Sequence, residues 1–96
     1  MNVTYSLALT LDALAAGYSY GFELMDVTGL PSGTVYPLLR RLERQQLVVG
    51  KFERESTARS EGRPTRRYYK LTAAGRTALA KCRARFPRIV LVGARG

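Results

Sequence analysis

One segment of this 96-residue sequence combines arginines and small residues at a spacing that could bind a polyanion. A helical period of 3.6 residues along residues 32–46 separates two sides of a predicted helix. The apolar side, which would face a core, carries Val35, Leu38, Leu39, Leu42 and Gln46. The opposite side carries Gly33, Thr34, Pro37, Arg40, Arg41 and Arg44, with Tyr36 at its flank. Because guanidinium groups bind phosphates and base edges, this pattern favours nucleic-acid binding, although a basic stripe can also be a solvated face.

The first turn of this predicted helix is suited to close approach by a nucleic acid. Ser32, Gly33 and Thr34 have small side chains, and the unpaired N–H groups of a first helical turn attract anions. Serine and threonine hydroxyls can donate to bases or to phosphates. Two alternatives remain at this point: Ser32 can be an N-cap, and the flanking Tyr36 can cover a hydrophobic rim as well as bind a phosphate.

A second group of basic side chains ends the polar segment 53–66, which has almost no apolar residues and is predicted to be a loop. The segment begins with acidic residues and finishes with Arg63 and Arg66, which Arg67 follows. Arg63 precedes Pro64, which favours extended backbone, and an extended arginine fits a narrow minor groove. The alternative is a mobile tip whose charges contact nothing.

The charge balance supports a polyanionic partner and the composition excludes several other classes. Sixteen Lys and Arg against seven Asp and Glu give a net charge of +9 and a pI of about 10.5. The sequence has no histidine and one cysteine, which argues against histidine-based catalysis, an intramolecular disulfide and a Cys/His metal site. We therefore expect no enzyme activity, metal or cofactor, and interpret Cys82 as a small buried apolar residue.

Hydrophobic residues at 46% and charged residues at 24% are typical of one globular domain. No apolar run reaches about 18 residues, so no membrane span is expected. Residues 1–16 lack a basic start and contain Asp12, which argues against a signal peptide and favours a cytoplasmic protein.

The elements that must position these side chains follow from periodicity and from helix start and stop signals. They are a helix over 3–16 ended by Gly17, a helix over 20–28 capped by Ser19 and ended by Gly29, a helix over 32–46 capped by Ser32, strands over 47–52 and 67–71 around the loop, and a helix over 73–86 capped by Thr72 and stopped by Pro87. This order predicts a mainly α fold with a small β-hairpin, the winged helix-turn-helix. Residues 1–86 would form the DNA-binding domain and residues 87–96 a short C-terminal tail.

Several sequence blocks together resemble the PadR family of transcriptional regulators. The most specific block is GTVYPLLRRLE, residues 33–43, which follows YGFELM at 20–25 and GLPS at 29–32. GRP at 62–64, RYY at 67–69 and LTAAG at 71–75 complete the pattern. The resemblance implies a winged-helix binder of double-stranded DNA, commonly a homodimer and often a repressor, in which some members respond to a small-molecule effector.

The resemblance assigns roles to matching positions. It makes the helix from Ser32 to Gln46 the recognition helix, puts Arg63 and Pro64 at the wing, and brings Tyr68 toward the DNA backbone. With the residue chemistry above, the predicted DNA-binding set is Ser32, Gly33, Thr34, Tyr36, Pro37, Arg40, Arg41, Arg44, Arg63, Pro64, Arg66, Arg67 and Tyr68.

The short segment after the wing resembles the shorter members of the family, since many others continue with a long C-terminal helix that builds the dimer. The dimer would then use the first and last helices, with Tyr5, Leu9, Leu79 and Phe86 as predicted contacts. A different class of function is an interaction adaptor or antagonist that keeps the winged-helix shape without DNA affinity. RNA binding is a weaker alternative because no aromatic platform for single strands is evident.

Overall fold

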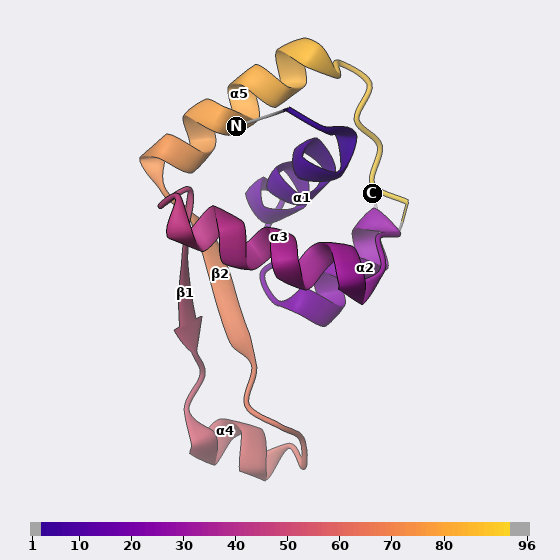
Figure 1. Ribbon diagram of the computed structural model, residues 1–96. Coiled ribbons are helices and arrows are strands. Elements are labelled where there is room, and N and C mark those ends of the chain that lie inside the picture. Colours follow the sequence, from indigo (N-terminus) through magenta and orange to yellow (C-terminus); the bar gives the residue numbers. More distant parts are fainter. Residues whose placement is uncertain (1–2, 93–96) are drawn as a thin grey trace.

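A computed structural model describes residues 3–92 and shows a helical body from which a long hairpin projects (Figure 1). The elements are α1 (Tyr5–Ala15), α2 (Gly21–Thr28), α3 (Ser32–Arg44), β1 (Val48–Phe52), α4 (Glu55–Ser60), β2 (Arg67–Leu71) and α5 (Ala73–Arg85). The predicted fold class, mainly α with a β-hairpin, is therefore confirmed. Residues 93–96 of the predicted tail lie outside the described residues.

Helix α1 is the centre of the body and is buried on almost every side. It contacts α2, α3, α5 and β2, so that even Thr10 is fully buried, its hydroxyl donating to the Ser6 carbonyl over 2.9 Å. Thr4 is its N-cap, since the Thr4 hydroxyl accepts the Leu7 N–H at 3.1 Å. The helical body is thus built around α1, which is packed on several sides, whereas its sequence pattern predicted one main apolar face.

The turn between α2 and α3 forms as expected, but the two predicted serine caps are wrong. Gly29 ends α2 in the left-handed region, with φ of 74°. The residues that cap α2 and α3 are Tyr20 and Pro31, neither of which makes a side-chain cap bond. Ser32 is instead the first residue of α3. Ser19 precedes the α2 cap, and its own N–H donates to the Glu23 carboxylate at 2.8 Å.

The core side of α3 is confirmed except at its end. The four predicted aliphatic residues are buried, namely Val35, Leu38, Leu39 and Leu42. Gln46 is exposed and lies beyond the helix, in the left-handed region at φ of 60°. There it allows the Leu47 N–H to reach the Leu42 carbonyl at 2.9 Å, which turns the chain into β1.

Replacing Gln46 with glycine is expected to raise the free energy of unfolding by about 0.5–1 kcal/mol, because a left-handed backbone strains every residue with a Cβ. Chemical denaturation would measure the change. Gln45→Gly is the matched control, since Gln45 has φ of −86° and gains nothing from glycine. A loss of stability in Gln46→Gly would contradict the strain.

The hairpin pairs β1 and β2 antiparallel, with Val48 opposite Leu71 and Phe52 opposite Arg67. The sequence analysis did not find a further pairing, in which Tyr20 forms a bridge with Tyr68 and the Tyr69 N–H donates to the Ser19 carbonyl at 2.7 Å. These two contacts hold β2 beside the residues that precede α2.

The prediction of a loop throughout 53–66 is wrong, because the segment contains the short helix α4 at the far end of the hairpin (Figure 1). Ala58 is its buried residue, only 2% exposed, and its carbonyl accepts the Arg63 N–H at 3.1 Å. A single small apolar residue was too weak a periodic signal to predict this helix.

Helix α5 begins and ends as predicted. The Thr72 hydroxyl accepts the Gly75 N–H at 3.0 Å, and the helix ends before Pro87. Beyond α5, Ile89 and Leu91 pack partly buried against the core as the chain turns back toward α2 (Figure 1).

Candidate nucleic-acid interface

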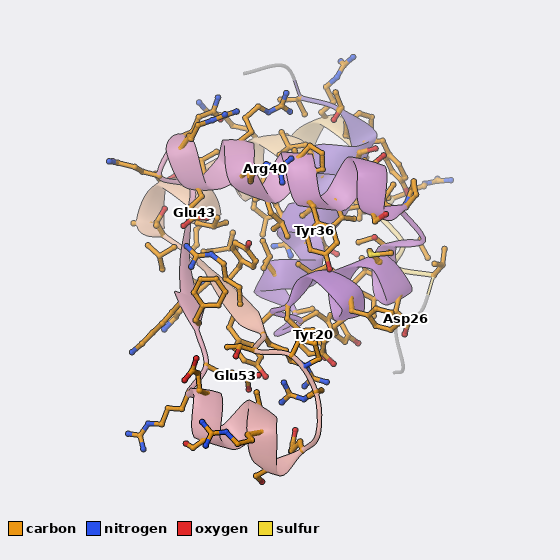
Figure 2. The ribbon with its side chains drawn as sticks, turned by 60° about the horizontal axis from the view of Figure 1, so that its bottom comes forward. Tyr20, Asp26, Tyr36, Arg40, Glu43 and Glu53 are labelled. Carbon is orange, nitrogen blue, oxygen red and sulfur yellow. The ribbon has the colours of Figure 1, made fainter. Side chains whose placement is uncertain are left out.

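The outward side of α3 presents the predicted basic residues together. Gly33, Pro37, Arg40, Arg41 and Arg44 are exposed and Thr34 is half-buried; Ser32 is exposed at the start of the helix. Arg40 lies on this outward side near the middle of α3 (Figure 2). We call Gly33, Thr34, Pro37, Arg40, Arg41 and Arg44 the α3 outer face.

The arginines of the α3 outer face have no acidic partner within residues 3–92. The described chain contains four ion pairs, Arg63–Glu53, Arg63–Glu61, Arg67–Glu43 and Arg83–Asp12. The nearest acid along the helix, Glu43, is therefore engaged by Arg67 from the hairpin. Three adjacent positive charges without compensation concentrate a field that attracts a polyanion.

Tyr36 lies at the flank of this face and points from α3 toward α2 (Figure 2). It packs on Gly21, the first residue of α2: a Cβ at Gly21 would lie 2.4 Å from a ring carbon and 2.6 Å from the hydroxyl oxygen of Tyr36. The ring is still 41% exposed. Tyr36 thus covers the start of α2 and keeps part of its surface toward solvent.

Arg63 is held within the wing, the hairpin segment from β1 to β2, by two carboxylates. Its guanidinium forms a two-pronged pair with Glu53, whose side chain is 8% exposed, and donates to Glu61 at 2.7 and 3.0 Å. Glu53 also accepts the Arg66 N–H at 2.8 Å. Because the hydrogen bond from Arg63 favours the ionised carboxylate, the pKa of Glu53 is lowered from its ordinary value.

Arg66 and Arg67 are likewise engaged by neighbours. The Arg66 guanidinium lies 4.1 Å above the Tyr20 ring. Arg67 pairs with Glu43 of α3 and lies 4.8 Å from the Phe52 ring, where a Cβ at Gly50 would be 2.7 Å from its Nε. These contacts join the wing to α2 and α3.

The other predicted wing residues lie close by. Pro64 is exposed, and Tyr68 is half-buried with its ring edge-on to Tyr20 at 5.6 Å. A groove of about 470 Å³ separates the wing from α2 and α3; its lining includes Tyr20, Phe22, Tyr36, Phe52, Pro64 and Arg66. The structure thus places the basic residues of the wing beside Tyr36 of α3, whereas none of the three α3 arginines lines this groove.

Lowering the pH should destabilise the wing. The depressed pKa of Glu53 contributes stability above the pKa it has in the unfolded chain, and this contribution is lost as the pH falls through the folded-state value. Urea denaturation at pH 6 and at pH 3 gives the loss of unfolding free energy between the two pH values. This loss should be smaller for Glu53→Gln than for the unmodified protein. Equal differences would contradict the role of Glu53.

The predicted dimer contacts are only partly available. Leu9 and Leu79 are 5% and 4% exposed, because α1 and α5 pack on each other within one chain, so the prediction is wrong for these two as surface contacts. Tyr5 is exposed and its ring meets Phe86 edge-on at 5.4 Å. These two aromatic residues stay a predicted contact.

Cys82 is a free cysteine that lies in the core. Cys82 is 1% exposed and burial raises the pKa of its thiol, as expected of an apolar core position. Residues 3–92 contain no group of three His, Cys, Asp or Glu side chains that could hold a metal ion. Among the described helices, none is long and apolar enough to cross a membrane.

Solved structures similar to this chain are winged-helix regulators. A PadR family transcription regulator from Clostridium difficile is 25% identical, with a TM-score of 0.74 and 88% of each chain covered. A PadR-like transcriptional regulator from Bacillus cereus is also 25% identical, with a TM-score of 0.64 over 84% of this chain and 80% of the other. A PadR family regulator from Eggerthella lenta, 24% identical with a TM-score of 0.65 over 86% and 75%, supports the fold. No curated protein matches the sequence significantly.

A family-level comparison extends over most of the chain. The sequence model of the Transcriptional regulator PadR-like family matches residues 10–81, from α1 to α5, three quarters of the sequence. Regulators of this family are DNA-binding proteins and not enzymes. With the winged helix-turn-helix architecture and the basic α3 outer face, this match shows that the chain belongs to the PadR-like family of transcriptional regulators.

Proposed function

We propose that this regulator is a homodimeric, sequence-specific repressor that reads the major groove of double-stranded DNA with α3. The observation that carries the proposal is the α3 outer face, where three arginines without acidic partners in the described chain lie on a helix fixed to the core by its other side. A helix of this kind fits a major groove about 12 Å wide. Its rigidity would hold the side chains in one register along the base pairs.

Within this proposal the exposed residues of α3 divide between bases and phosphates. Thr34, Tyr36 and Arg40 contact base edges and so set the preferred DNA sequence. Arg40 donates to the O6 and N7 of a guanine. The small residues Ser32 and Gly33 bring the N–H groups of the first turn of α3 to the sugar–phosphate backbone of the DNA, and Pro37 lies in close contact with the DNA. Arg41 and Arg44 bind phosphates. The arginine–phosphate contacts would provide most of the affinity and make it fall steeply with salt.

The wing supplies the second set of contacts in this proposal. Pro64 and Arg66 lie at the side of the wing that borders the groove beside α2 and α3, where a sugar–phosphate backbone or a minor groove can approach. The Tyr68 ring lies edge-on to Tyr20, which lines the same groove. Arg63 and Arg67 act in this proposal mainly by holding the wing in shape, since their guanidiniums already meet carboxylates. Their positive charge still adds to the local field.

The dimer would place two copies of α3 in successive major grooves, about 34–36 Å apart on a pseudo-palindromic site. Tyr5 and Phe86, paired edge-on where α1 begins and α5 ends, are the proposed contacts between subunits.

Selection of duplexes from a random pool, combined with sedimentation equilibrium, tests the proposed function. We expect a pseudo-palindromic consensus and a dimer at the concentrations that bind it. A monomer that retains no duplex would contradict the proposal and favour the adaptor alternative. Repression would then be checked with a reporter placed behind the selected site.

A further inference from the structure

The α3 outer face is bordered by a second depression, on the side opposite the wing. It has a volume of about 390 Å³ and lies where α3 meets the start of α1. Its polar lining consists of Thr4 and Ser6 from α1 and of Thr34, Arg41 and Arg44 from α3. The sequence analysis did not identify Thr4 or Ser6, because their proximity to α3 follows only from the fold.

The chemistry of this depression suits a phosphodiester. Two guanidiniums and three hydroxyl groups line it, and no carboxylate does. Neither arginine takes part in an ion pair within residues 3–92. The Thr4 hydroxyl accepts the Leu7 N–H at 3.1 Å, so its proton is still available to donate to an anionic oxygen.

The position of the depression agrees with its chemistry. A helix lying in a major groove has one sugar–phosphate backbone on each side. On one side α3 faces the groove of Tyr36 and the wing, and on the other it faces this depression. A protein that contacts phosphates on both sides of the helix in the major groove fixes the position of that helix relative to the two DNA strands.

We infer that Thr4, Ser6, Arg41 and Arg44, in the depression beside Thr34, bind a phosphate of the DNA strand that borders the major groove beside α1. The inference rests on the proposed function and adds to it a contact from α1. This contact carries no base information, so it strengthens binding to every duplex alike and sets how deeply α3 enters the groove.

Single methylphosphonate substitutions, each of which removes the charge of one phosphate, test this site in the selected duplex. The proposed site corresponds to one or two adjacent phosphates in each half-site, separate from those bound by the wing, and we expect substitution there to weaken binding of the unmodified protein about tenfold. In Arg44→Gln the same substitution should cost less than about threefold, because one of the two guanidiniums that bind this phosphate is already absent. For Arg44→Gln, the negative slope of the logarithm of the DNA-binding constant against the logarithm of the salt concentration should be smaller in magnitude by about 0.9.

Arg76→Gln is the matched control, since Arg76 lies exposed on α5 and lines a different depression, with Ser19 and Lys70. This variant should keep the full tenfold penalty. An Arg44→Gln variant that also keeps the full penalty at every position would overturn the inference while leaving DNA binding intact. A protein that selects no duplex would overturn the proposed function and this site together.

A second variant tests the contribution of α1. Thr4→Asp retains an N-cap residue, so the helix should still form, but it brings a carboxylate into the depression. We expect affinity to fall about tenfold for selected and unselected duplexes alike, whereas Thr4→Ser keeps it. Thr77→Asp, at an exposed position of α5, makes the same charge change elsewhere and should cost less than about threefold. Equal losses in the two Asp variants would overturn the role of α1.

Discussion

Replacing Gly75 with alanine is expected to lower the free energy of unfolding by about 3 kcal/mol. The added methyl group would lie 2.0 Å from the carbonyl oxygen of Leu47 and 3.2 Å from the Leu71 Cδ2 atom. The carbonyl cannot turn away at no cost, because it accepts the Thr72 N–H at 3.1 Å. The helix must therefore move, although alanine in an unhindered helix would be favoured over glycine.

Gly33→Ala is the matched control for this loss of stability. Gly33 is also helical, but a Cβ there meets no atom within 4 Å. Alanine at this position is expected to raise the free energy of unfolding by about 0.4–1 kcal/mol. Urea denaturation of both variants gives the comparison, and a Gly75→Ala protein as stable as the unmodified one would show that α5 can shift without loss.

The helix-turn-helix could be predicted because its signals are local. The four buried aliphatic residues of α3 recur at helical spacing, Gly29 marks the end of α2, and Thr72 caps α5 through a bond to a residue three positions on. The exposure of the α3 arginines follows from the same periodicity. Each of these features depends on residues that lie close together in the sequence.

The features that the sequence did not reveal depend on contacts between distant segments. Arg67 reaches Glu43 across 24 positions and Arg63 reaches Glu53 across 10, so both pairs exist only once the hairpin register is set. The burial of Leu9 was also not predicted. It follows from the packing of α2, α3, α5 and β2 around α1, which the sequence of α1 alone does not show. The sequence pattern does not show that Arg63 and Arg67 have carboxylate partners, and their contact with DNA stays a prediction.

Replacing Arg40 with alanine is expected to weaken binding to the selected duplex by about 1–3 kcal/mol, roughly 5- to 150-fold. Arg40 is exposed on the α3 outer face and has no acidic partner in the described chain, so its guanidinium can reach a base edge. Its removal should change the free energy of unfolding by less than about 0.5 kcal/mol. Fluorescence anisotropy with the selected duplex measures the affinity, and thermal unfolding checks the fold.

The pattern of the loss across duplexes separates a base contact from a phosphate contact. If Arg40 reads a guanine, the variant should lose discrimination at one base pair per half-site and bind all four bases there about equally. Arg76→Ala, which removes an exposed arginine from α5, should leave that discrimination unchanged. A uniform loss across all duplexes would assign Arg40 to the backbone, and an unchanged affinity would remove it from the interface, because an arginine that inserts into the major groove cannot be deleted without effect.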